Sequence, residues 1–428
     1  MIMYTFHKYS DVPRKYSKYI EKHLREQPDF EERDDLDKYY WSDKNSKSIL
    51  QDYYPFDECS MIDKKYIHSL YPRITIKTFI IKESNIDEFN AFVKNDKPGT
   101  IYYLKPGDKY IGGSKGIRIS TNPYELYNSI SSNKESYIIQ KEVPPMLMDG
   151  YKYDIRVYVL VVYNSDIVHI YLYPGILRFC KDKYDPKKMD INRHITITGD
   201  FKIMDDINDD IKDIIYPTLQ KFTPQKDIVG YQYLGYDIIC DKNGKYHIIE
   251  INIQPSLERI QYSIIDDFSE LVARSIQTNK GHKPYISSTL INNTTLLLTE
   301  LNRSHLKNLY EITSNITVMK YIGNLKVWDL EKTKRFIGYK NDFNYYFNGI
   351  ILSGKLIGVI GKNKDKLTIY LNPKYTNKGY GKIALGLYIN ITEGPLTADV
   401  LTSNTSSIQF FKKYKSVIKN NIITFYIR

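Results

Sequence analysis

Short runs of hydrophobic residues, each bounded by Gly, Pro, Asn or Asp, dominate the middle of the chain. They are rich in Ile, Val and Tyr, a composition typical of β-strands. We therefore expect a strand-rich region over residues 71–280, closed by a helix at about 257–278. The clearest strand candidates lie at 73–81, 100–105, 136–141 and 153–162.

The last third has a different pattern. Apolar positions at helical spacing (Leu301, Leu306, Leu309) come first, and strands follow. We expect His305 to be an exposed residue of this helix, without a role. A polar stretch before this helix predicts a linker, and the first 70 residues show no clean periodicity. The chain is thus divided into an N-terminal region of unassigned role, a central domain, a linker and a C-terminal domain, at 1–70, 71–280, 281–293 and 294–428.

Two apolar runs that flank Asn243-Gly244 predict a β-hairpin, because a two-residue turn requires positive φ at both central positions. The numbers of facing residues then add to 487, which sets Asp237 directly opposite Glu250. Facing carboxylates repel each other unless a cation lies between them. Asn252 points to the same face as Glu250. Two carboxylates and a carboxamide are typical of a Mg²⁺ site; a solvated polar hairpin face is the alternative.

Upstream of this hairpin lie residues suited to a nucleotide. Lys105 ends a strand, and the Gly-rich loop 112–117 carries Lys115. Such a loop lets the backbone approach phosphates, and lysines neutralise them as point charges. The strand end Gln140–Val143 offers a backbone edge that could pair with adenine. Each feature alone is equally typical of an ordinary turn or strand end.

A second group of charges follows on the next strands. Lys152, Asp154 and Arg156 alternate and so share one strand face. Arg178 lies on a further strand. A lone strand arginine usually forms a structural salt bridge, whereas several cations that converge on a carboxylate hairpin indicate a clamp for phosphate and carboxylate groups.

Taken together, the order of these motifs resembles the tubulin–tyrosine ligase-like branch of the ATP-grasp superfamily, over about residues 71–275. The resemblance implies an α+β fold in which two α+β subdomains hold ATP. It also implies a role for each matching residue. Lys105 and Lys115 would contact phosphates, and Gln140, Lys141 and Val143 would hold the adenine. The phosphate tail and the reacting carboxylate would be positioned by Lys152, Asp154, Arg156 and Arg178. Mg²⁺ would be held by Asp237, Glu250 and Asn252.

The reaction implied by the resemblance is amide-bond formation. ATP phosphorylates a carboxylate, and an amine then attacks the acyl phosphate. The chemistry is phosphoryl transfer by positioning and charge neutralisation, with Arg156, Arg178 and Glu250 as the catalytic candidates. One position departs from the family: Ile197 stands where His-Leu-Thr-Asn normally ends in Asn.

The last third carries a second motif. A strand ending at Leu371 is followed by Lys378-Gly-Tyr-Gly381 and a helical run. Glycines at a helix N-terminus let a pyrophosphate approach the backbone N–H groups. A further strand leads to Asn404, which is suited to cap the next helix. A GxG turn in an unrelated α+β domain is the alternative.

This arrangement is similar to the GCN5-related N-acetyltransferases, over about 294–428. The similarity implies an α/β domain with a mixed, mainly antiparallel sheet that binds acetyl-CoA. Two positions depart from the family: Thr376 replaces the usual Arg or Gln, and Phe411 stands at the position of a general-acid tyrosine. The implied acetyl-CoA contacts are Leu371, Lys378, Gly379, Tyr380, Gly381 and Asn404.

Charge and composition constrain the partners. The 428-residue chain has a net charge of +11, but from Leu290 onward 20 Lys/Arg face 8 Asp/Glu, so the basic excess belongs to the last third. That distribution does not favour a nucleic-acid partner. The chain has no apolar run long enough to span a membrane, no signal-like start, and three scattered cysteines without a disulfide or zinc pattern. We expect a cytoplasmic protein.

Three hypotheses remain. The leading one is a ligase that joins a free amino acid to a protein or peptide, fused to an acetyltransferase-like domain; a tubulin-like acidic tail is one candidate acceptor. The second retains the ligase chemistry with a small-molecule acceptor. The third is a catalytically impaired module that binds nucleotide or CoA, for which Ile197, Thr376 and Phe411 are the support.

Overall fold

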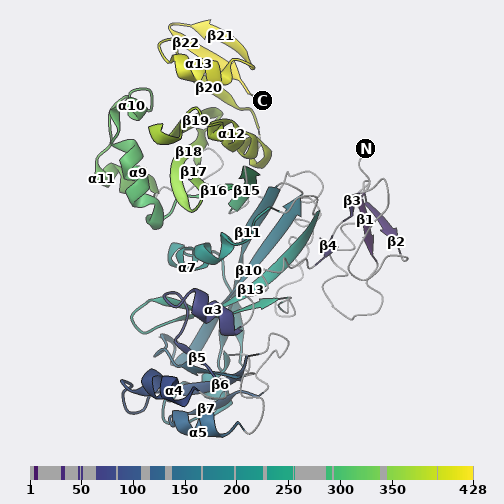
Figure 1. The fold of residues 1–428 in the computed structure, drawn as a ribbon, viewed down its shortest axis with the longest axis vertical. Coiled ribbons are helices and arrows are strands. Elements are labelled where there is room, and N and C mark those ends of the chain that lie inside the picture. Colours follow the sequence, from purple (N-terminus) through teal and green to yellow (C-terminus); the bar gives the residue numbers. More distant parts are fainter. Residues whose placement is uncertain are drawn as a thin grey trace.

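The computed structural model combines helices with large, mainly antiparallel sheets and confirms the α+β class (Figure 1). Among the described residues, no helix is long and apolar enough to cross a membrane. The structure describes residues 4–7, 30–33, 47–48, 50–51, 64–82, 85–107, 116–130, 137–164, 167–196, 199–224, 229–253, 255, 286–291, 294–337, 345–392 and 394–427. The predicted helix at 257–278, Lys115 and Ile197 lie outside these ranges.

A four-stranded sheet forms the first layer of the central region. Its strands are β5 (Thr78–Ile80), β6 (Tyr102–Pro106), β7 (Arg118–Ser120) and β8 (Tyr137–Lys141), in the order β5-β8-β6-β7. Helices α4 (Ile86–Val93) and α5 (Pro123–Asn128) flank it. A small core fills the space between them, with Phe89 stacked on Tyr127 at a centroid distance of 4.7 Å. The runs at 100–105 and 136–141 are strands as predicted, whereas only the end of 73–81 is one.

A second, much larger sheet faces this one. Its first strands, in spatial order, are β14 (Tyr246–Ile253), β13 (Val229–Cys240), β10 (Tyr151–Asn164) and β11 (Ile167–Phe179). Short strands β4 (Leu50–Gln51), β9 (Leu147–Met148) and β12 (Phe201–Ile203) attach to them. Strand β10 is central and fully apolar over Val157–Tyr163, as expected for a strand covered on both faces.

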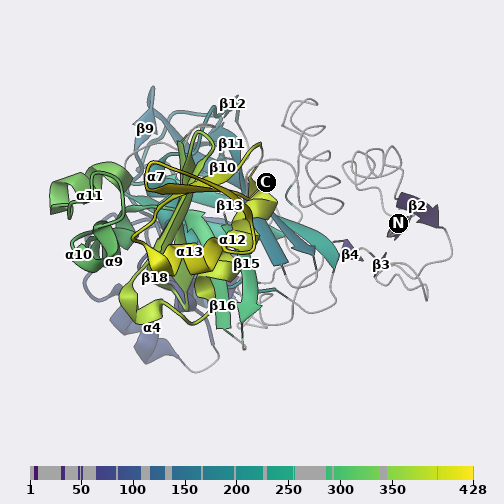
Figure 2. The ribbon, with the colours of Figure 1, turned by 90° about the horizontal axis from the view of Figure 1, so that it is seen from above.

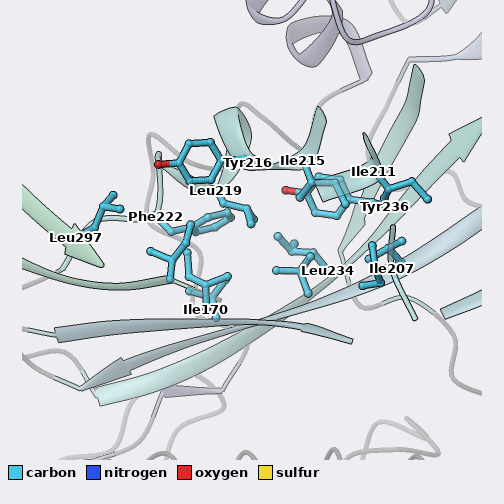
Figure 3. Close-up of a cluster of buried hydrophobic side chains, with 14 of the residues drawn as sticks. Ile170, Ile207, Ile211, Ile215, Tyr216, Leu219, Phe222, Leu234, Tyr236 and Leu297 are labelled. Carbon is cyan, nitrogen blue, oxygen red and sulfur yellow. The ribbon is translucent and has the colours of Figure 1, made fainter. Parts of the chain in front are cut away.

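Helix α7 (Asp209–Leu219) lies over one face of this sheet. Its apolar residues recur at helical spacing and point down onto the strands, where Ile211 and Ile215 meet Leu234 (Figure 3). The buried hydroxyl groups of Thr218 and Tyr236 are 2.7 Å apart and satisfy each other. The shorter helices α3 (Lys64–Leu70) and α6 (Ile191–His194) contact β14 and β10, respectively.

The same sheet continues into the last third of the chain. Its further strands are β16 (Thr294–Glu300), β17 (Tyr345–Leu352), β18 (Lys355–Asn363), β19 (Lys366–Leu371), β20 (Thr397–Leu401), β22 (Ile422–Tyr426) and β21 (Lys415–Lys419). Strands β19 and β20 are parallel and pair only at Lys366 and Thr397 among the described residues.

Helices cover both faces of these strands (Figures 1 and 2). One face packs against η3 (Arg303–His305), α9 (Leu306–Thr313), α10 (Ile316–Met319) and α11 (Leu330–Ile337). The other face packs against α12 (Tyr380–Ile391) and α13 (Thr405–Phe411). A short helix, η4 (Pro373–Tyr375), follows β19. In both views, a small parallel sheet lies apart: β1 (Tyr4–His7), β2 (Phe30–Arg33) and β3 (Lys47–Ser48).

Where the sequence predicts a linker at 281–293, the structure has strand β15 (Ile286–Ile291). It pairs with β11 on one side and β16 on the other, so the central sheet and the last third share one hydrogen-bonded ladder. His305 also differs from expectation. It ends η3, is buried, and meets the ring of Tyr216 of α7 edge-on, with 5.6 Å between the ring centroids, so this end of η3 packs against the central region.

Gly175 of β11 tests how tightly the bulged pair β10–β11 is built. The ladder shifts register between Arg156 and Tyr158, and a Cβ at Gly175 would lie 1.4 Å from the Arg156 carbonyl oxygen. We predict that Gly175→Ala lowers the free energy of unfolding by about 3 kcal/mol, because the backbone of β10 or β11 must move to make room for the methyl group. Urea unfolding of the full chain measures this change in stability. Gly386→Ala, in α12 with open space around its Cβ, is the control and should be neutral or stabilising. Equal stability of the two variants would contradict the prediction.

Candidate active site

A cavity lies between the four-stranded sheet and the large sheet. Its volume is about 160 Å³, and Pro106 and Ile117, which border it, flank the stretch at 108–115 that lies outside the described residues. All of the described residues predicted to contact ATP or metal line it. They are Lys105, Gln140, Lys141, Val143, Lys152, Asp154, Arg156, Arg178, Asp237, Glu250 and Asn252.

Asp237 of β13 and Glu250 of β14 face each other, as predicted. The route to this register is not the predicted one. Lys245 closes the hairpin by bonding Asp241, so the connecting loop has three residues, and only Gly244 within it has positive φ (82°). That loop alone would shift the pairing by one residue. A bulge beside Asp237 restores it, leaving one extra residue, Ile249, on β14.

Two arginines satisfy the Asp237 carboxylate. Arg156, directly opposite on β10, makes a bidentate contact, with 2.9 Å between Nη2 and Oδ2, and Arg178 Nη2 lies 3.0 Å from Oδ1. Burial alone would raise the pKa of Asp237, but the two guanidinium groups outweigh it and hold that pKa well below its usual value. Arg178 also forks onto Asp154, at 2.7 and 2.8 Å. The four charges form one buried array.

Glu250 and Asn252 complete the oxygen-rich face. Asn252 Nδ2 lies 3.0 Å from Asp237 and 3.2 Å from Glu250, so the carboxamide stands between the carboxylates. Turning this amide about its last torsion would present Oδ1 instead. The donor set fits a hard cation such as Mg²⁺. Lys64 of α3, which the sequence analysis missed, lies 3.2 Å from Glu250 Oε2.

A further carboxylate, Glu142, was also missed. It follows β8, is almost completely buried, and lies 2.7 Å from Lys152 Nζ. Tyr184 donates to its other oxygen at 2.7 Å, and Tyr103 donates to Oε1. Burial would raise the pKa of Glu142, but Lys152 and the hydrogen bonds lower it well below its usual range. His194 joins the cluster through Tyr103, at 3.3 Å. Glu142 therefore fixes Lys152 in the cavity wall.

The two residues of the predicted adenine edge differ in what their side chains do. Gln140 is buried and donates to Thr78 at 3.2 Å, while its Oε1 has no partner among the described residues. The Lys141 ammonium instead pairs with Asp96 at 2.8 Å and lies 4.0 Å from the centre of the Phe92 ring. The Lys141 side chain is thus held by α4 and the turn that follows it.

The balance of charge favours an anionic ligand. Six cationic and four anionic side chains line the cavity, a net charge of +2. The pKa of Lys105 is lowered to about 8, mainly because the ammonium is buried; the nearby Glu250 raises this pKa, and Lys64 lowers it. An approaching phosphate would favour the charged ammonium. The cations are Lys64, Lys105, Lys141, Lys152, Arg156 and Arg178, and the anions Glu142, Asp154, Asp237 and Glu250.

In the last third, the structure places the predicted glycine-rich turn at a helix N-terminus. Gly379 precedes α12 with φ of 85°, a conformation that disfavours a side chain. Gly381 lies beside Leu371 of β19, whose side chain would be 3.6 Å from an added Cβ. Lys378 and Tyr380 flank Gly379 on either side.

Two more residues have structural roles here. Asn404 caps α13 by accepting from the Ser407 N–H at 3.2 Å, so its side chain is occupied within the fold. Phe411 is buried against Phe425, with ring centroids 5.6 Å apart. An acid at the Phe411 position would point into the core.

Comparisons with known proteins agree with this geometry. Residues 56–200 match the tubulin-tyrosine ligase family, and residues 295–416 match the acetyltransferase (GNAT) domain. The central region is therefore ligase-like and the last third acetyltransferase-like, as the motifs predicted. Both families indicate an enzyme, and they imply the use of ATP and of acetyl-CoA, respectively.

Several curated proteins are similar to the central part of the chain. A probable alpha-tubulin polyglutamylase Ttll1 of Tetrahymena thermophila is 28% identical over 224 residues, covering 40% of this chain and 52% of that protein. The human tubulin polyglutamylase TTLL11 is 27% identical over 236 residues (41% and 32%), and mouse tubulin polyglutamylase TTLL5 is 24% identical over 253 residues (46% and 18%). The chain thus spans about half of the first relative and less of the others.

Replacing Glu142 tests its role in holding Lys152. We predict that Glu142→Gln lowers the free energy of unfolding by about 3 kcal/mol near neutral pH, because a buried ammonium loses its counter-charge. Since the pKa of Glu142 is lowered on folding, its contribution is complete above the unfolded value of about 4.3 and is lost as pH falls towards the folded value. Urea unfolding across this range should show the two proteins converging in acid. A constant difference would contradict the assignment.

Proposed function

We propose that the central domain, over 71–280, is an ATP- and Mg²⁺-dependent carboxylate–amine ligase of the cytoplasm. The observation that carries this proposal is the convergence, in one cavity between two sheets, of the carboxylate pair Asp237–Glu250 with cations from five chain segments. An oxygen-rich pair beside net positive charge suits a metal-bound phosphate chain.

The proposed reaction has two steps. The γ-phosphoryl group of ATP moves to a carboxylate oxygen and ADP leaves. The amine of an amino acid then attacks the acyl carbon, phosphate departs with the C–O bond electrons and takes up the proton that the amine nitrogen loses, and an amide forms. Mg²⁺, held by Asp237, Glu250 and Asn252, would neutralise phosphate charge. No protein nucleophile is required, so catalysis comes from positioning and charge stabilisation.

The chain's own residues divide these tasks. Lys105 and Lys152 would bind phosphate oxygens, and Gln140, with its unpartnered Oε1, would accept from the adenine amino group, beside Val143. Arg156 and Arg178 would hold the reacting carboxylate, because their guanidinium groups are already oriented by the buried aspartates. Asp154 positions Arg178. Lys115 would add a further phosphate contact.

The acceptor is proposed to be a protein or peptide. The relatives named as tubulin polyglutamylases support this class, and a tubulin-like acidic tail and a free amino acid are the matching co-substrates. A small-molecule acceptor is the competing hypothesis. Product formed from free amino acids and ATP, without any added protein, would favour it.

A second activity is proposed for 294–428: acetyl transfer from acetyl-CoA to an amine. The observation that supports this is the left-handed Gly379 at the start of α12, whose Gly381 lies beside Leu371 at the end of β19. Among the described residues, β19 pairs with the parallel strand β20 only at Lys366 and Thr397. The open helix N-terminus would receive the pyrophosphate from Lys378–Gly381. Leu371 and Asn404 are the other residues for which the resemblance implies acetyl-CoA contacts.

The first test is ligand-induced stabilisation. A ligand at about 100 times its dissociation constant stabilises by about 2.7 kcal/mol, so we predict that Mg²⁺·ATP raises the melting temperature by several degrees. Glu250→Gln should lose the metal-dependent part of this rise in melting temperature. Glu331→Gln, which replaces an exposed carboxylate of α11, should retain it. Acetyl-CoA should stabilise both variants. The absence of any ATP shift would refute the ligase; binding without turnover would indicate a non-catalytic module.

Lys105 predicts a pH dependence. With its pKa at about 8, the protonated fraction falls from about three quarters near pH 7.5 to about one tenth near pH 9, so ATP affinity should fall about eightfold. Lys105→Arg remains charged and should show a flat profile. Isothermal titration calorimetry at the two pH values measures this. An equal fall in ATP affinity between the two pH values in the wild type and in Lys105→Arg would exclude Lys105 as the titrating contact.

A further inference from the structure

The segment 316–330, which contains α10 and ends at the first residue of α11, exposes four aliphatic side chains at the outer edge of the molecule (Figures 1 and 2). We call it the apolar segment. Apolar side chains that gather on a surface and are rimmed by charge mark interaction sites. Their exposed fractions run from 39% to 58%, and the four residues are Ile316, Leu325, Val327 and Leu330.

Leu325 has an unfavourable backbone conformation. Its φ is 60°, a left-handed value that glycine and asparagine adopt much more readily than a branched side chain does. Leucine at this position is therefore disfavoured twice, by its backbone and by its exposure to water. Strain of this kind persists mainly where function depends on it. The exposed leucine thus indicates that something outside the chain covers it.

A packed base beneath the apolar segment holds these side chains outward. The Trp328 backbone N–H donates to Thr313 O at 2.9 Å, and the Trp328 ring packs edge-on against Phe336, with 5.1 Å between the ring centroids. The buried hydroxyl groups of Thr313 and Thr333 lie 2.9 Å apart and bond each other. The segment is therefore fixed on α9 and α11.

Positive charge accompanies the aliphatic side chains. The neighbouring carboxylates are occupied within the fold: Asp329 accepts from the Lys332 backbone N–H at 2.7 Å, and Glu331 pairs with Lys334 at 2.7 Å. Three exposed cations in and beside the segment have no ion-pair partner in the part of the chain that the structure describes. They are Lys320, Lys326 and Arg335.

We propose that the apolar segment docks the protein on the surface of an anionic lipid bilayer. Aliphatic side chains that point outward become buried in a medium that deforms around them, as the boundary between headgroups and acyl chains does. The neighbouring cations are attracted to anionic headgroups. A nucleic acid would also attract lysines, but its bases stack on aromatic rings, which leucine and valine lack. This inference goes beyond both proposed activities, because no residue of the segment belongs to either site.

Co-sedimentation of the full chain with lipid vesicles tests the contribution of charge. We expect binding to vesicles of phosphatidylcholine with about one third phosphatidylserine, and much weaker binding to phosphatidylcholine alone. Lys320→Gln combined with Lys326→Gln should weaken binding about tenfold. Lys412→Gln combined with Lys419→Gln, at two exposed lysines of the last third, makes the same change in net charge and should leave binding unchanged.

Leu325→Asn separates a role in docking from a role in folding. Asparagine tolerates a positive φ better than leucine does, so the melting temperature should stay the same or rise. Vesicle binding should nevertheless weaken about fivefold, because an apolar contact with the bilayer is lost. Leu147→Asn, the same replacement at an exposed leucine of β9, is the control and should bind vesicles as the wild type does.

Three outcomes would overturn the proposal. If the wild type binds neither kind of vesicle, the segment does not dock on lipid. If both lysine pairs weaken binding equally, or if Leu325→Asn binds as the wild type does, net charge alone attracts the protein to the vesicles. If the wild type forms dimers in light scattering that Leu325→Asn abolishes, and binds no vesicles, the segment is covered by a second copy of the chain.

Discussion

The array Asp154–Arg178–Asp237–Arg156 is the constraint on which the central site depends. Each of these side chains is buried, and a buried charge is tolerated only when a partner and further hydrogen bonds compensate for lost hydration. The alternation of sign across β11, β10 and β13 achieves this, because facing strand positions bring opposite charges together. The array also makes the facing pair Asp237–Glu250 possible. Without the two arginines, two carboxylates in this interior would repel each other.

The sheet connects this site to the rest of the molecule. Strand β15 joins the ligase-like ladder to the acetyltransferase-like one, and η3 adds a second contact, between His305 and Tyr216 of α7. Burial lowers the pKa of His305 to about 4, so the imidazole is neutral at physiological pH, and its Nδ1 accepts a hydrogen bond from the Asn302 N–H at 3.1 Å. The two matched regions therefore share hydrogen bonds and core packing, unlike domains on a flexible tether.

Local patterns predicted much of the site. The alternation in Lys152, Asp154 and Arg156, and the hairpin around Gly244, are encoded within a few residues. Lys64 and Glu142 were missed because their roles arise from contacts distant in sequence: α3 reaches Glu250, and Glu142 meets Lys152 only when two sheets face each other. β15 was missed because its ladder partners are remote, and a short polar-flanked run carries little signal of its own. Lys115 and Ile197 lie outside the described residues, so what the sequence predicts for them stays a prediction.

The extra residue on β14 has an evolutionary consequence. A three-residue hairpin loop and a bulge at Ile249 each displace the register by one position, and the two displacements cancel where Asp237 meets Glu250. A one-residue slip moves every side chain of a strand to the opposite face. A deletion in the loop alone would therefore turn Glu250 and Asn252 away from the cavity. A change in the length of the hairpin loop preserves the site only when a change in the bulge on β14 compensates for it. Insertions and deletions in this hairpin should therefore occur in such pairs during evolution.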